Sequence, residues 1–165
     1  MSEKSITRIQ SDTQITTFSP KTFVDIFEPK KCLWNFRDVT NIYMMFKLYD
    51  KSSLEEFSIL SIKKHFSEKW VIKYTELWII DLLNFLNLKS SMNKSQIQET
   101  AFHIVTTYPR LNIIDITLVF RRLKQGYYGE FYNSIDGSKI LISFKKYVAE
   151  RTDIEADIRR KEQDD

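Results

Sequence analysis

The longest uninterrupted helical pattern in the chain is Ser67-Glu-Lys-Trp-Val-Ile-Lys-Tyr-Thr-Glu-Leu-Trp-Ile-Ile-Asp-Leu-Leu-Asn-Phe-Leu-Asn-Leu88. No glycine or proline interrupts it. Its apolar side chains recur with the 3.6-residue period of an α-helix: Trp70, Tyr74, Leu77, Trp78, Leu82, Phe85 and Leu86. We expect one long helix over residues 67–88, at the centre of the fold.

Helix-start patterns lie on both sides of this segment. Ser53–Glu56 and Ser95–Gln98 have capping-box spacing, in which a side chain at each end accepts a free backbone N–H. Asn112–Asp115 and Asp136 are further starts, each followed by apolar residues at helical spacing. The sequence therefore predicts an all-α protein, a compact bundle of about six helices with a C-terminal three-helix unit.

Three regions are expected along the chain. Residues 1–36 are rich in Ser, Thr and Gln at their start, and we interpret them as a partly extended N-terminal arm. Residues 37–151 are expected to form a single helical domain. Residues 152–165 are charged and are expected to form a helical or frayed tail.

Composition limits the class of protein. Hydrophobic residues make up 42% of the 165 positions, enough for a core, and three glycines and three prolines are too few for a turn-rich β-protein. The most apolar run, residues 77–86, is interrupted by Asp81 and Asn84 and is too short to span a bilayer. Cys32 is the only cysteine, and the N-terminus has no apolar signal segment. We expect a cytoplasmic protein without membrane contact.

Charge is unevenly distributed. Residues 110–151 carry a net charge of +4, and residues 152–165 carry −3. A basic region beside an acidic tail permits nucleic-acid contact without requiring it. A mixed solvated surface explains the same pattern.

No catalytic or metal-binding pattern is present. His65 and His103 are the only histidines, and neither has further ligands at metal-binding spacing. Cys32 has no histidine partner in the sequence, and no Walker A, Rossmann or G-x-S-x-G motif occurs. We expect a protein that is not an enzyme and that uses no metal and no cofactor.

The candidate functional site is a glycine-rich loop. All three glycines lie within residues 124–137. They follow a basic cluster at the end of a predicted helix. Glycines allow close approach, cations bind phosphates, and aromatic rings stack on bases. The residues expected to bind nucleic acid or a partner are Arg121, Arg122, Lys124, Tyr127, Tyr128 and Tyr132.

A structural interpretation of the same loop stays open. Gly126 suits the position just after a helix end, and Gly137 suits the start of a helix capped by Asp136. Gly129 has no simple local explanation. In this interpretation the tyrosines pack the last helix onto the bundle, and a KH-type loop is disfavoured because no flanking strands are predicted.

Several motifs resemble a family of small helical proteins encoded by phages, plasmids and mobile elements of gut Bacteroidota. They are the linked K-x-G-x-Y-G-x-x-Y pattern of residues 124–132, the Ile135-Asp-Gly137 motif and Glu150-Arg151, within a resemblance over residues 70–152. The family is uncharacterised, so it implies no catalytic residues. It implies a mobile-element setting and a signature that contains Lys124, Gly126, Tyr128, Gly129, Tyr132, Asp136 and Gly137.

Two functional hypotheses follow. The first is a non-enzymatic accessory protein of DNA replication or maintenance, which binds DNA or a replication protein through residues 121–137. The second is a protein-interaction module or homodimer in which that loop is structural. Its docking region would be the aromatic-rich N-terminal region, which includes Phe23, Phe27, Leu33, Trp34 and Phe36.

Overall fold

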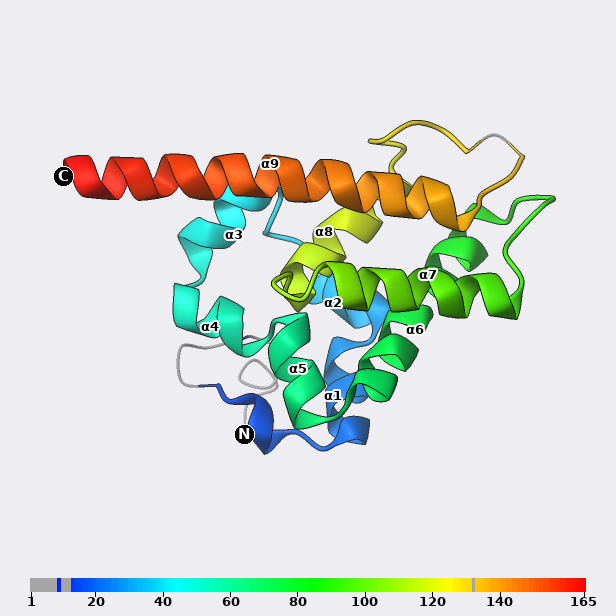
Figure 1. The fold of residues 1–165 in the computed structure, drawn as a ribbon, viewed down its shortest axis with the longest axis horizontal. Coiled ribbons are helices and arrows are strands. Elements are labelled where there is room, and N and C mark those ends of the chain that lie inside the picture. The colour runs from blue at the N-terminus through cyan, green and yellow to red at the C-terminus, as the bar shows by residue number, and fades with distance from the viewer. Residues whose placement is uncertain (1–8, 10–12, 132) are drawn as a thin grey trace.

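The computed structural model describes residues 9, 13–131 and 133–165, and these form an all-α bundle (Figure 1). The fold class is confirmed. The described residues contain nine α-helices and one 3₁₀ turn, rather than about six helices. The elements are η2 (Ile15–Thr17), α1 (Pro20–Phe27), α2 (Pro29–Asn35), α3 (Ile42–Leu48), α4 (Lys51–Glu56), α5 (Ile59–His65), α6 (Glu68–Leu86), α7 (Lys94–Thr107), α8 (Ile113–Lys124) and α9 (Gly137–Asp164).

The central element is α8, not the long α6 helix expected at the centre. Every residue from Leu111 to Phe120 is buried, and α2, α3, α6 and α9 all pack against α8. The unbroken burial means that α8 is covered on all sides over this length. By contrast, α6 exposes Lys73, Leu77 and Ile80, so one side of α6 faces solvent.

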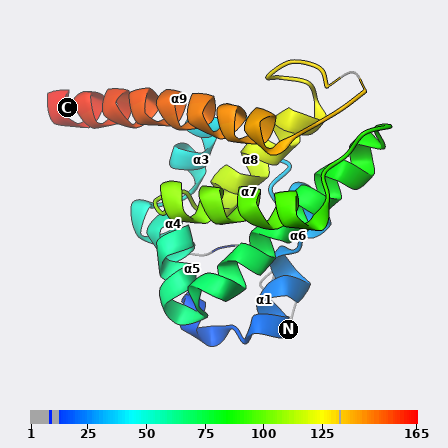
Figure 2. The same cartoon turned by 45° about the vertical axis from the view of Figure 1, so that its right-hand side comes forward.

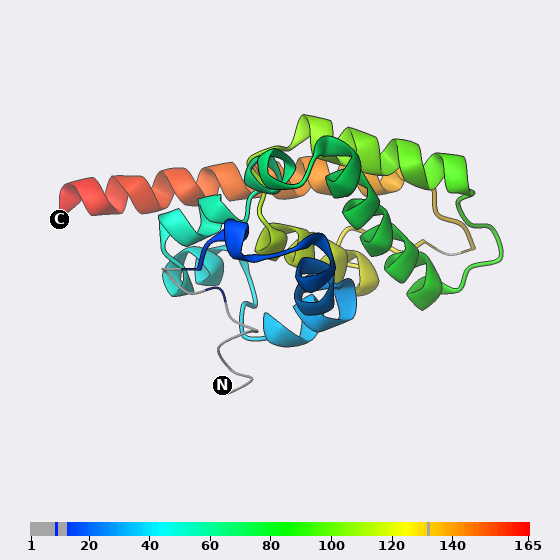
Figure 3. The same ribbon diagram turned by 90° about the horizontal axis from the view of Figure 1, so that it is seen from below.

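The N-terminal region is helical where an extended arm was expected. Helices α1 and α2 begin at Pro20 and Pro29, each with its first turn capped by the preceding side chain, Ser19 or Glu28. Phe23 and Phe27 are buried against one another with ring centroids 4.9 Å apart. Figure 3 shows these blue helices on the side of the body away from α9. The expected arm is therefore part of the core from Pro20 onward, while residues 1–8 and 10–12 lie outside the described residues.

Two predicted capping boxes are wrong in register. Asp50 caps α4 through the N–H of Ser53, so Ser53 lies inside the helix instead of starting it. Helix α7 begins at a capping box formed by Asn93 and Gln96, two residues before the predicted Ser95. In both places an Asp or Asn, which caps about as well as serine, lies two or three residues upstream and starts the helix there.

The last helix includes the charged tail. Helix α9 continues without interruption from Gly137 to Asp164. At 1.5 Å per residue its 28 residues extend over roughly 42 Å. Figure 1 shows its C-terminal half extending past α3 and away from the rest of the bundle.

The connections α6–α7 and α8–α9 lie at the same end of the molecule (Figures 1 and 2). The N–H of Ser90 donates to the carbonyl of Asn133 at 3.1 Å and joins the two connections. The glycine loop is thus attached to the bundle at its middle as well as at both ends.

Candidate functional site

Gly126 ends α8 in a Schellman motif. Its φ is 71°, its N–H donates to the Leu123 carbonyl at 3.3 Å, and the next N–H, of Tyr127, donates to the Arg122 carbonyl at 3.0 Å. These two bonds are those expected of a C′ glycine. The prediction for this position is confirmed.

Gly129 closes a turn. Its N–H donates to the Gly126 carbonyl at 3.0 Å, and its φ is 112°. A Cβ at Gly129 would meet no atom within 4 Å, so the backbone angle, not space, accounts for glycine.

Gly137 is required by contact with another helix. A Cβ on Gly137 would lie 2.3 Å from Oγ1 of Thr100 on α7. Just before it, Asp136 caps α9 by accepting the N–H of Lys139 at 3.1 Å, as predicted. The hydroxyl of Ser138 and this N–H lower the pKa of Asp136.

Arg121 binds inside the protein. Its guanidinium donates to the carbonyls of Val39 at 2.5 Å and Phe36 at 2.8 Å, which lie between α2 and α3. Burial lowers the pKa of Arg121. The side chain therefore holds the N-terminal helices onto α8.

Arg122 is buried between α8 and α9. It donates to Glu150 at 2.7 Å and to the hydroxyl of Tyr128 at 3.0 Å. Its guanidinium lies 4.4 Å from the ring centroid of Tyr127 and 5.3 Å from that of Tyr147. Burial alone would lower the pKa of Arg122. The hydrogen bonds with Glu150 and Tyr128 outweigh this effect, so the pKa is raised.

Lys124 joins α8 to α6. Its ammonium lies 2.6 Å from the carboxylate of Asp81 and 5.1 Å from the ring centroid of Phe85. Both charged side chains are mostly buried, at 14% and 12% exposure. All three cations predicted for the binding site therefore have partners within the fold.

The aromatic residues of the loop differ in exposure. Tyr127 is 59% exposed, Tyr128 is half-buried and Phe131 is buried. Tyr132, also predicted to bind, lies outside the described residues. The described part of the loop presents one well-exposed ring to solvent.

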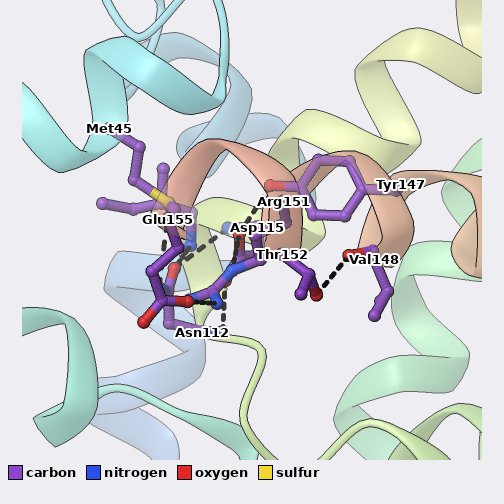
Figure 4. A network of polar contacts seen from close by, with 9 residues as sticks. Met45, Asn112, Asp115, Tyr147, Val148, Arg151, Thr152 and Glu155 are labelled. Carbon is purple, nitrogen blue, oxygen red and sulfur yellow. Dashed lines mark hydrogen bonds and ion pairs between the residues drawn. The ribbon is translucent and has the colours of Figure 1, made fainter. Parts of the chain in front are cut away.

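A buried polar network at the other end of α8 was not predicted (Figure 4). The carboxylate of Asp115 accepts the Tyr147 hydroxyl at 2.5 Å, Nε of Arg151 at 3.0 Å and the N–H of Asn112 at 2.9 Å. Arg151 donates onward to Glu155 at 3.1 Å. The bond between Asp115 and Asn112 is the predicted helix start, but the contacts with α9 span more than thirty residues and leave no local sequence pattern.

The protonation of this network is controlled by burial. Burial raises the pKa of Asp115, while Arg151 and Tyr147 partly offset the shift. Burial, together with the neighbouring Asp115, raises the pKa of Tyr147, which therefore stays a hydrogen-bond donor at neutral pH. Because Asp115 and Tyr147 have no exposed surface, they cannot reach a substrate; they fix α9 on α8 and orient Arg151.

Across residues 9, 13–131 and 133–165, no three His, Cys, Asp or Glu side chains gather as metal ligands. None of the helices in the described part of the chain is long and apolar enough to cross a bilayer.

Residues 91–165 match a sequence model described as "Family of unknown function (DUF6633)". The match begins just before α7 and includes α8 and α9, so it coincides with the C-terminal three-helix unit. This part of the chain is therefore similar to a family whose function is unknown. No curated protein and no solved structure matches the chain.

Proposed function

We propose that this chain is a non-enzymatic protein-interaction module in which the glycine loop is structural and a surface formed by α2 and α6 binds a second copy of the chain. The observation that carries the proposal is the internal pairing of Arg121, Arg122 and Lys124. A cation that is held by buried or half-buried partners is costly to redirect to an external ligand.

The α2–α6 surface is apolar and exposed. Leu77, Ile80 and Phe85 on α6 are 38%, 42% and 59% exposed, and Trp34 on α2 is 67% exposed. Of the N-terminal aromatic residues predicted to dock a partner, Phe23, Phe27 and Phe36 are buried in the core, so Trp34 is the one that is well exposed. Large exposed apolar side chains on one surface are typical of contact sites.

The surface also suits a two-fold partner. A shallow groove of about 390 Å³ separates α1 and α2 from α6 beside Leu77 and Ile80. Lys31, Asp25 and Glu28 lie along it, so both signs of charge are present. A patch that contacts its own copy must be self-complementary, and mixed charge around an apolar centre permits this.

Light scattering over a dilution series tests the proposal. We expect a dimer that dissociates on dilution, and a monomer when Leu77→Lys is combined with Ile80→Glu. The matched control combines Phe102→Lys with Ile142→Glu, at positions 44% and 52% exposed on α7 and α9, and should remain dimeric. A wild-type chain that is monomeric at every concentration would refute self-association, and equal loss in both double variants would move the contact elsewhere.

A second candidate function is nucleic-acid contact at the loop. It is favoured by Tyr127, whose ring is exposed and lies against the Arg122 guanidinium, because exposed aromatic rings stack on bases. The resemblance of the motifs then suggests a cytoplasmic accessory of replication or maintenance in a phage or mobile element. Fluorescence anisotropy with labelled single-stranded DNA over a salt series tests it: Tyr127→Ala should weaken binding, and no binding at low salt would eliminate it.

A further inference from the structure

The strongest unexplained feature of the molecule is a pair of adjoining cavities beside α9. The first, about 370 Å³, lies between α4, α5 and α9; the second, about 380 Å³, lies between the α7–α8 connection and α9. Pro109, Arg110, Arg151 and Glu155 line both. Each volume is at the small end of the range of pockets that hold small molecules, roughly 300–1,000 Å³.

The cavities carry an excess of positive charge. Five cationic side chains line them, together with two carboxylates, Glu55 and Glu155. Both carboxylates already face a cation: Glu155 accepts from Arg151, and Glu55 lies 3.9 Å from Lys51. Within the described residues, the remaining three cations have no ion pair: Lys64, Arg110 and Arg159.

Arg151 gives the cavities a fixed hydrogen-bond donor. The buried carboxylate of Asp115 holds its Nε, and Glu155 holds Nη1. Its Nη2 makes no hydrogen bond to the described part of the chain. Asp115 and Glu155 balance the charge of Arg151, so the electrostatic attraction for an anion comes from Lys64 and Arg110. Arg151 contributes a hydrogen-bond donor with a fixed orientation.

The first cavity also has apolar lining residues. Phe46, Leu54, Leu60 and Pro109 line it, and the ring centroid of Phe46 lies 5.2 Å from the Arg151 guanidinium. The N–H of Leu60 donates to the Pro109 carbonyl at 2.9 Å, which fixes α5 against the residue before Arg110. A ligand here would meet cationic side chains and, close beside them, a ring and aliphatic side chains.

We propose that the first cavity binds a small organic phosphate of mononucleotide size, with its phosphate group at Lys64, Arg110 and Arg151 and its ring against Phe46 and Leu54. Cationic side chains from α5, the α7–α8 connection and α9 line this one cavity, which suits the several acceptor oxygens of a phosphate. The site is separate from the α2–α6 surface, so it does not depend on self-association.

Calorimetric titration of the full chain at low salt tests the site with adenosine monophosphate, adenosine and inorganic phosphate. We expect saturable binding of adenosine monophosphate at one site, weaker binding of inorganic phosphate that competes with it, and the weakest binding of adenosine. Absence of saturable binding of adenosine monophosphate would overturn the proposal. A single-stranded oligonucleotide that binds when the mononucleotide does not would also overturn it, in favour of a surface for a polyanion.

Substitutions locate the site. Lys64→Gln combined with Arg110→Gln should weaken adenosine monophosphate binding by about tenfold or more, because two charge-assisted bonds are removed. Both side chains are exposed and unpaired in the described structure, so the variant should fold, as circular dichroism can verify. The control, Lys69→Gln with Lys73→Gln, removes the same charge from exposed positions on α6 and should change affinity by less than about twofold. Equal weakening in both variants would show general attraction rather than a site.

Discussion

At the scale of single residues, Gly137 shows how one missing methyl group positions a helix. Gly137 is the first residue of α9, and a Cβ here would lie 2.3 Å from Thr100 Oγ1. We expect Gly137→Ala to lower the free energy of unfolding by about 1–3 kcal/mol. Urea denaturation monitored by circular dichroism measures it.

Thr100→Ala provides the control for that prediction. Without Oγ1, the nearest atoms to an alanine Cβ at 137 are the Cβ of residue 100 at 3.5 Å and Met92 Cε at 3.7 Å, which are ordinary contacts. Adding Gly137→Ala to Thr100→Ala should therefore be neutral or stabilising. The same loss in both backgrounds would show that the clash is not the cause.

Cys32 carries a pH-dependent part of the stability. Burial raises the pKa of its thiol to about 12, against an ordinary value near 9.0. Above pH 9 the unfolded chain loses this proton and the folded protein keeps it, so stability falls as pH rises toward 12. The fall reaches about 1.4 kcal/mol per pH unit.

Comparison with Cys32→Ala isolates this effect from other groups that titrate in alkali. From about pH 8 to about pH 11, the wild-type free energy of unfolding should decrease more steeply than that of the variant. Two parallel curves would show that the folded thiol ionises as readily as the unfolded one.

Local residues of the candidate site were predictable from sequence, and their partners were not. Gly126 and Asp136 act through neighbours within four positions, so turn and cap chemistry predicts them. Arg121 bonds residues 82 and 85 positions away, and Lys124 bonds one 43 positions away. The sequence shows that Arg121 and Lys124 belong to a basic cluster. Only the fold shows that both side chains bind groups inside the protein.

At the scale of elements, α8 and α9 are joined by Asp115. Asp115→Asn keeps an oxygen for the Asn112 N–H but leaves Tyr147 and Arg151 short of an acceptor inside the protein. We expect a loss of about 1–3 kcal/mol in the free energy of unfolding by urea denaturation.

Asp136→Asn is the matched control, because it makes the same chemical change at an exposed helix start. Asparagine caps as well as aspartate, so the loss should be under about 0.5 kcal/mol. Comparable losses at positions 115 and 136 would contradict a special role for the buried carboxylate.

The sequence predicted which long segments are helical. It did not predict which helix is central, nor the short helices. The 3.6-residue period predicts α6 because its exposed side is polar in part, as at Lys73 and Asn84. Periodicity does not show that α8 is covered on every side, because this cover depends on how α2, α3, α6 and α9 pack around it, and so its central place was missed. Between residues 37 and 66 three helices of six or seven residues follow one another, and each is too short for a period to be distinct.

At the scale of the whole molecule, the residues matched by the family model contain only some of the helices that pack on α8. Of the helices packed on α8, residues 91–165 provide α9, whereas α2, α3 and α6 lie before the match. We expect a fragment of residues 91–165 to lack a cooperative thermal transition in circular dichroism, while the full chain unfolds in one step. Addition of a separate fragment of residues 1–90 should restore the transition, and a cooperative melt of the isolated C-terminal fragment would refute this dependence.

The burial of α8 on every side also determines how its backbone exchanges hydrogen with water. Local fraying cannot expose an amide in the middle of this helix, such as that of Val119, so its proton exchanges only when the whole bundle opens. The exchange rate at that single position therefore measures the global opening free energy. A ligand that binds only the folded chain slows this rate by a factor set by its concentration relative to its Kd.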